Sequence, residues 1–255
     1  MALLEVCCGN PESVDAAVAG GARRIELCAD LERDGLTPPI AWIRTAKERY
    51  PELTVHVLIR PRDGDFVYSP EEADLMAKQV ESALEAGADG IVIGALTPER
   101  DVDLPLTERL VSLVESYNLA AALQRSDLCH AANDSHFFPG PARRVSITFH
   151  RAFDRCRRPF EALEQIITLG CDRILTSGQA PTVEDGLNRL RELHQRARGR
   201  IIILPGGGVT PENAANILSF TGCREIHASA SVAADGKKMT STVLVEAILQ
   251  AINAF

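Results

Sequence analysis

Short apolar runs alternate with longer amphipathic segments along the whole chain. Eight such runs occur, at residues 3–9, 24–29, 55–62, 90–96, 145–151, 173–178, 200–208 and 225–231. Each run has the length of a buried strand, and the segments between the runs have the polarity and length of helices. Strand–helix repeats of this number are typical of a (β/α)8 TIM barrel. We therefore predict an α/β protein with one barrel domain over residues 1–255.

The segments between the runs predict the helices that cover the barrel. We expect helices over residues 13–19, 40–49, 70–86, 105–116, 159–169, 183–197, from 211 onwards, and 241–253. Ser69 and Glu72 form a capping-box pattern at the start of the third helix. Thr210 and Pro211 are expected to open the seventh, as N-cap and first helical residue.

Residues 118–144 break the repeat, and we interpret them as an irregular insertion or interface element. They lie between a predicted helix and the fifth strand, so the topology puts them near the N-terminal face, away from the barrel mouth. They contain Cys129, His130 and His136. These residue types bind zinc, but a fourth ligand is missing and the spacing is irregular. A polar loop is the simpler interpretation.

Composition narrows the function classes. The chain has 255 residues, 45% hydrophobic residues and a net charge of −8. This charge argues against nucleic acids or anionic membranes as partners. No apolar run approaches the ~18 residues of a membrane span, and no secretory signal pattern opens the chain. Seven cysteines in no disulfide-like spacing indicate reduced thiols. We expect a cytoplasmic protein.

The first two strands end in a matched pair of thiols. The segments LEVC and IELC place Cys7 and Cys28 on the same faces as Glu5 and Glu26, because residues two apart on a strand share a face. If these faces point into the barrel, the thiols lie side by side near the mouth, each above a carboxylate. Such a pair could bind Cu(I), or the cysteines could simply belong to the core.

Arginines end the third strand. Arg60 and Arg62 flank a proline and form a fork suited to a carboxylate or phosphate. The alternative is that they form salt bridges with Glu5, Glu26 or Asp65. Both interpretations remain open from the sequence, and the two arginines are candidate partners for the glutamates inside the strands.

A glycine run follows the seventh strand. Gly206, Gly207 and Gly208 would let backbone N–H groups approach a ligand, and Ser177 adds a hydroxyl from the neighbouring strand end. Barrels often bind phosphate at the loops after strands seven and eight. The sequence therefore predicts an anion site here, with a tight turn into the next helix as the alternative.

Two histidines end strands five and eight. His150 and His227 could act as acid–base groups or metal ligands near neutral pH, or each could be a hydrogen-bonded strand residue. Together with Glu26, Arg60 and Arg62, they are the candidate catalytic residues of an enzyme.

Several longer strings of the chain resemble one known family. These strings are EVCCGNPESVDAAVAGGARRIELCADLERDGLTP, IRPRDGDFVYS, FHRAFD, ILTSGQAP, ILPGGGVTPEN and REIHASA. They resemble the CutC family, named for copper homeostasis, over nearly the whole chain in order. The resemblance implies a cytoplasmic (β/α)8 barrel that forms a homodimer or homotetramer. It also implies Cu(I) binding by Cys7 and Cys28. The main departure from the family is the segment near 118–144, because this link is usually shorter in the family.

Two functions therefore compete. The first is Cu(I) binding at the barrel mouth for copper homeostasis. The second is an enzyme that acts on a small anionic or phosphorylated substrate. A purely structural or interaction protein would explain the insertion but not the reactive residues at the mouth.

Overall fold

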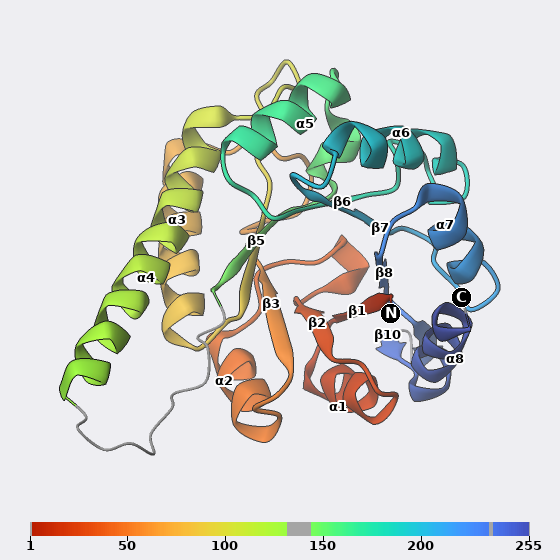
Figure 1. The fold of residues 1–255 in the computed structure, drawn as a ribbon, viewed down its shortest axis with the longest axis horizontal. Coiled ribbons are helices and arrows are strands. Elements are labelled where there is room, and N and C mark those ends of the chain that lie inside the picture. Colours follow the sequence, from red (N-terminus) through yellow and green to blue (C-terminus); the bar gives the residue numbers. More distant parts are fainter. Residues whose placement is uncertain (1, 132–143, 235–236, 255) are drawn as a thin grey trace.

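The computed structural model describes residues 2–131, 144–234 and 237–254. Within these ranges eight parallel strands surround a central axis (Figure 1), in the order β7-β6-β5-β4-β3-β2-β1-β8. A backbone bridge between Gly206 and His227 joins the two ends of this sheet. The strands are β1 Leu3–Cys8, β2 Arg24–Leu27, β3 Thr54–Leu58, β4 Gly90–Ile93, β5 Ser146–Phe149, β6 Arg173–Thr176, β7 Ile202–Pro205 and β8 Glu225–Ala228. The predicted barrel is confirmed.

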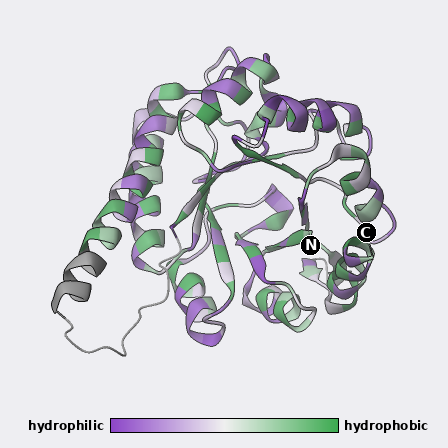
Figure 2. Cartoon of the chain, viewed as in Figure 1, coloured by the Kyte–Doolittle hydropathy of each residue, from purple (hydrophilic) through white to green (hydrophobic). Residues whose placement is uncertain are grey.

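Helices cover the outside of the strands (Figure 1). They are α1 Pro11–Ala19, α2 Ile40–Arg49, α3 Pro70–Glu85, α4 Leu104–Ala131, α5 Pro159–Thr168, α6 Leu187–Ala197, α7 Ala214–Thr221 and α8 Thr242–Asn253. Hydrophobic and hydrophilic residues are mixed along these helices (Figure 2). Among the described residues, none of the helices combines the length and apolarity that crossing a bilayer requires.

Successive side chains of a strand point to opposite faces, so they pack in two separate hydrophobic clusters. Val6 and Cys8 of β1 pack in the large apolar layer between strands and helices. The intervening residue, Cys7, belongs to a separate small cluster inside the barrel. Its buried members are Cys7, Cys28, Leu58 and Val92. The period of two therefore directs Cys7 to the barrel interior and Cys8 to the helices.

The predicted start of α3 agrees with the structure, whereas the predicted start of α7 does not. Ser69 caps α3 with the expected capping box, because its side chain accepts from Glu72 N and the Glu72 carboxylate accepts from Ser69 N. The start expected for α7 is wrong. Thr210 opens a turn, and Asn213, whose Oδ1 accepts from Thr210 N, is the N-cap of a helix that begins at Ala214.

Helix α4 is longer than the sequence pattern suggested. It continues to Ala131, so residues 117–131 are helical and not irregular. The reason is that these residues are rich in strong helix formers, and the first proline after Pro105 is Pro139. The remaining residues of the expected insertion, 132–143, and the side chains of Cys129, His130 and His136 lie outside the described part of the chain.

A two-stranded hairpin follows β8 and was not predicted. It comprises β9 Ser231–Ala234 and β10 Lys237–Thr240, paired antiparallel. The Asp-Gly pair at 235–236 is a hairpin signal that could have revealed it. Contacts tie β10 to the loops that follow β1 and β2. Asn10 Nδ2 lies 3.2 Å from Met239 Sδ, and Lys238 N donates to Glu32 Oε1.

Candidate metal and anion sites at the barrel mouth

The two thiols predicted to be neighbours are neighbours. The sulfurs of Cys7 and Cys28 lie 3.6 Å apart inside the barrel. Cys28 is fully buried, whereas Cys7 retains 8% exposure. Glu26, paired with Cys7 in the β1–β2 register, places Oε1 3.9 Å from Cys7 Sγ.

His227 joins this group from β8. The atoms that Cys7, Glu26 and His227 could offer to a metal ion all lie within 4.8 Å of one another. The other side of the His227 ring contacts Glu5, with 2.9 Å between Nδ1 and Glu5 Oε1. We call Cys7, Cys28, Glu26 and His227 the thiol site.

Burial and charge set the protonation of the thiol site. The hydrogen bond with Cys28, together with burial, raises the pKa of Cys7 well above its usual value. Burial raises the pKa of Glu26 to about 7, although the charge of His227 lowers it. Burial alone would lower the pKa of His227, but hydrogen bonds with Cys7 and Glu5 and nearby carboxylate charge raise it. The Cys7 thiol is therefore protonated near neutral pH.

A network of charged side chains lies next to the thiol site in the barrel interior. Glu5 Oε2 is 2.8 Å from Arg24 Nε and 2.9 Å from His56 Nδ1. The Arg24 guanidinium also reaches Glu225, which pairs with Arg173 at 2.8 Å. Barrel interiors are commonly filled by branched apolar residues, so this polar filling is unusual.

Arg60 and Arg62 are not the partners of the buried glutamates, contrary to expectation. Arg24 occupies that position for Glu5, because the β1–β2 register sets these two residues opposite each other. Arg62 instead pairs with Glu72 at 2.6 Å and with Asp65 at 2.9 Å. The salt-bridge alternative for Arg62 is confirmed through Asp65.

Arg60 holds two loops together. Its Nη1 donates to the carbonyls of Arg33, Asp34 and Gly35, and its Nη2 donates to the carbonyl of Gly64. The residue is only 4% exposed. Its guanidinium therefore stabilises the β2–α2 and β3–α3 loops.

His150 is buried beside Arg60 and Phe66. Its Nδ1 accepts from Ala152 N at 3.1 Å, and its ring centroid is 5.0 Å from that of Phe66. Nε2 has no hydrogen-bond partner among the described residues. Burial, with the charge of Arg60, lowers the pKa of His150 to about 3. The imidazole is therefore neutral at physiological pH.

The glycine loop, Gly206–Gly208, lies beside Arg151, which the predicted anion site did not include. Gly207 has a φ of +103°, and a Cβ there would lie 3.2 Å from Arg151 Nη1. Arg151 Nη2 donates to Ser177 Oγ at 3.0 Å, and its side chain is 43% exposed. The structure thus brings Ser177, the glycine loop and a guanidinium together.

The match to one family model decides which family these residues represent. The model of the CutC family matches residues 2–136 and 139–232. The chain belongs to the CutC family.

Individual relatives agree with this assignment. A CutC family protein from Bacteroides thetaiotaomicron is 44% identical over 241 residues, 94% of this chain and 86% of the relative. The structure of CutC from Streptococcus agalactiae, provisionally assigned to copper homeostasis, has a TM-score of 0.75 at 28% identity. It covers 90% of this chain and 99% of that chain.

Other solved barrels resemble this CutC family member in fold only. The 3-keto-L-gulonate-6-phosphate decarboxylase from Vibrio cholerae has a TM-score of 0.59 at 14% identity, with 100% of this chain and 98% of that chain covered.

Asp154 is a further residue that sequence reasoning missed. Its carboxylate accepts from the hydroxyls of Thr176 and Ser177 and from the backbone N–H groups of Ser177 and Gln179. It also pairs with Arg151 at 2.8 Å. It thereby fixes the loop after β6 in this CutC family member. Its hydroxyl and amide partners come from the end of another strand, so the residues around it in the sequence do not indicate this role.

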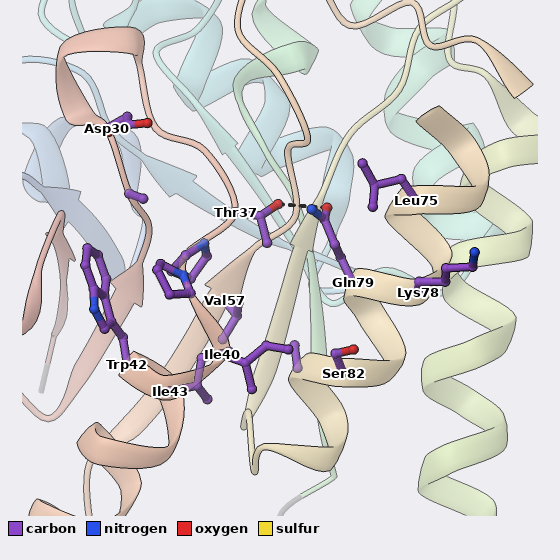
Figure 3. Close-up of a pocket in the computed structure, with 14 residues that line it drawn as sticks. Asp30, Thr37, Ile40, Trp42, Ile43, Val57, Leu75, Lys78, Gln79 and Ser82 are labelled. Carbon is purple, nitrogen blue, oxygen red and sulfur yellow. Dashed lines mark hydrogen bonds between the residues drawn. The ribbon is translucent and has the colours of Figure 1, made fainter. Parts of the chain in front are cut away.

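The outer surface carries a separate cavity of about 650 Å³ between α2 and α3 (Figure 3). Trp42 and Ile43 line it from α2, and Leu75 and Gln79 line it from α3. Thr37 Oγ1 donates to Gln79 Oε1 at 2.9 Å, as the dashed line shows. Its lining includes no member of the thiol site or the glycine loop.

Proposed function

We propose that this CutC family member handles copper in the cytoplasm and binds Cu(I) through Cys7 and Cys28. The observation that carries the proposal is the 3.6 Å separation of the two sulfurs inside the barrel mouth. Soft thiolate ligands select Cu(I), and burial keeps the bound ion away from solvent oxidants. The link of a Streptococcus agalactiae relative to copper homeostasis supports the same function.

Binding is expected to release protons. The pKa of Cys7 is raised by its hydrogen bond with Cys28 and by burial, so metal must displace a proton from the thiol. The apparent affinity for Cu(I) therefore increases with pH.

An anaerobic Cu(I) titration against a competing chelator tests the proposal. Wild type is expected to bind one ion tightly, and the Cys7→Ser/Cys28→Ser variant is expected to lose it. Cys8→Ser is the matched control, because Cys8 faces the helices and its Sγ contacts Ser13 O. Weak binding by wild type, or binding unchanged in the double variant, would contradict the proposal.

A second candidate function is catalysis on a small anionic or phosphorylated substrate. Among the described residues, the N–H groups of Gly208 and Val209 have no hydrogen-bond acceptor. They lie next to Gly207, Arg151 and Ser177, so the loop offers N–H donors, a hydroxyl and a cation to an anion. His150, His227 and Glu26 would supply acid–base groups. Arg60 and Arg62 would position the neighbouring loops.

Phosphate binding tests this candidate directly. Inorganic phosphate at 100 times its dissociation constant should stabilise the protein by ~2.7 kcal/mol. Arg151→Ala should abolish this stabilisation, whereas Arg155→Ala, an exposed neighbour, should retain it. A screen of phosphorylated metabolites then follows. No stabilisation of wild type by any of these anions would remove the anion site.

The family resemblance also carries the proposal that the chain assembles as a homodimer or homotetramer. Sedimentation equilibrium measures this directly, and a monomer at micromolar concentration would contradict it.

A further inference from the structure

The thiol site holds more ligands than Cu(I) requires. Two thiolates are sufficient for Cu(I), yet Glu26 and His227 place their own donor atoms within 4.8 Å of Cys7. Oε2 of Glu26 is buried and has no hydrogen-bond partner among the described residues. An unpartnered carboxylate oxygen in this position costs free energy unless something else binds it.

His227 is held as metal-bound histidines are held. Its Nδ1 contacts the Glu5 carboxylate at 2.9 Å, which leaves Nε2 as the nitrogen directed to Cys7. Glu5 is itself fixed by Arg24 at 2.8 Å. A carboxylate behind the distal nitrogen is the usual support for a histidine ligand of zinc.

The distance between the sulfurs favours a tetrahedral ion. With metal–sulfur bonds of ~2.3 Å, sulfurs 3.6 Å apart subtend an angle of ~103° at a shared ion. This angle is close to tetrahedral. Linear coordination of Cu(I) would require the two sulfurs to move apart.

We propose that the thiol site also binds a divalent, tetrahedrally coordinated cation of the zinc class, with Cys7, Glu26 and His227 as ligands and Cys28, 3.6 Å from Cys7, at the fourth position. Binding releases the two thiol protons, the Nε2 proton of His227 and any proton on Glu26 to solvent, and changes no oxidation state. The inference rests on the proposed function only in that both use Cys7 and Cys28 as ligands.

Anaerobic titration with Co²⁺ tests the inference, because tetrahedral Co²⁺ with thiolate ligands has intense visible and charge-transfer bands. Wild type is expected to bind one Co²⁺ with these bands, and Zn²⁺ is expected to displace it. His227→Gln should weaken Co²⁺ binding at least about 10-fold and remove the tetrahedral spectrum. Its affinity for Cu(I) should change much less, because both sulfurs remain. His194→Gln, on α6, is the matched control.

X-ray absorption spectroscopy of the zinc-loaded wild type identifies the ligands of zinc without a variant. The test therefore still applies if His227→Gln fails to fold. Two sulfur ligands and one imidazole are expected around zinc. Tight Cu(I) binding without tetrahedral Co²⁺ or zinc binding would overturn the inference and leave the proposed function intact. Loss of both metals would overturn both. A tetrahedral Co²⁺ spectrum unchanged in His227→Gln would overturn the assignment of the third ligand.

Discussion

Glu5 and Arg24 form an ion pair inside the barrel, with 2.8 Å between Arg24 Nε and Glu5 Oε2. The Glu5 side chain is 0% exposed and that of Arg24 is 4% exposed, so neither charge is hydrated. Burial would raise the pKa of Glu5, but the charge of Arg24 and hydrogen bonds with His227 and His56 bring it well below its usual value. The ionised carboxylate then orients His227 toward Cys7.

Removing the cation should therefore be costly. Arg24→Met leaves Glu5 as an uncompensated buried charge and is expected to destabilise the protein by ~3–5 kcal/mol. Urea unfolding at pH 7 measures this free energy. Arg33→Met is the control, because the Arg33–Asp63 pair is about half exposed and should contribute little to stability.

The double variant Glu5→Gln/Arg24→Met distinguishes the effect of losing the ion pair from the effect of losing the packing of the Arg24 side chain. It should recover part of the stability lost in Arg24→Met, because no buried carboxylate remains without a cation. If the double variant were as unstable as the sum of the two single variants, the ion pair would not be the cause.

Arg60 should be required for the order of two loops, because its guanidinium reaches the carbonyls of Arg33, Asp34, Gly35 and Gly64 at once. A lysine ammonium is a point charge and cannot span both loops. Arg60→Lys is expected to destabilise the protein by ~2 kcal/mol, since the buried guanidinium is lost and four carbonyls, three of them only partly buried, lose charged donors. Hydrogen exchange should accelerate in residues 31–36 and 63–66.

Arg109→Lys is the matched control for this substitution, because the exposed Arg109–Asp74 pair joins only two side chains. Unchanged exchange in Arg60→Lys would show that the loops are held by other contacts.

Asp154 should determine the conformation of the loop after β6. Asp154→Asn replaces one carboxylate oxygen with an amide group that cannot accept from Ser177, Gln179 and Thr176 together. We expect a loss of ~1–3 kcal/mol in stability and weaker phosphate binding at the glycine loop. Asp185→Asn, on an exposed turn of the following segment, should change neither. Calorimetry with and without phosphate distinguishes these results.

Local rules explain which site residues could be predicted. The period of two along strands and the order of a barrel are sufficient to bring Cys7 beside Cys28, and the structure confirms this. The same rules separate Cys7 from Cys8 without any knowledge of their partners.

Register explains what could not be predicted. The stagger between neighbouring strands decides that Glu5 lies opposite Arg24 on one side and His227 on the other. A sequence read one segment at a time does not contain that stagger, so Arg60 and Arg62 were equally reasonable partners for Glu5. Arg151 and Asp154 were missed because they act across strand ends. The helical 117–131 segment, by contrast, was readable from its helix formers.

His150 should make the protein less stable in acid. Burial, with the charge of Arg60, lowers the pKa of His150 to about 3, whereas an unfolded histidine has a pKa near ~6.5. Below that pH the unfolded chain binds a proton that the folded chain does not. The stability is therefore fully present above the unfolded pKa and is lost as the pH falls toward the folded pKa.

His150→Gln should remove this contribution. We expect its unfolding free energy to fall less steeply between about pH 5.5 and 4, by ~1.4 kcal/mol per pH unit relative to wild type. Glu5 and His56, whose pKa values are also lowered, remain in both proteins and cancel in the comparison. Urea unfolding across this range measures the slopes, and His194→Gln should retain the wild-type slope. Equal slopes in wild type and His150→Gln would mean that the folded protein protonates His150 as readily as the unfolded chain does.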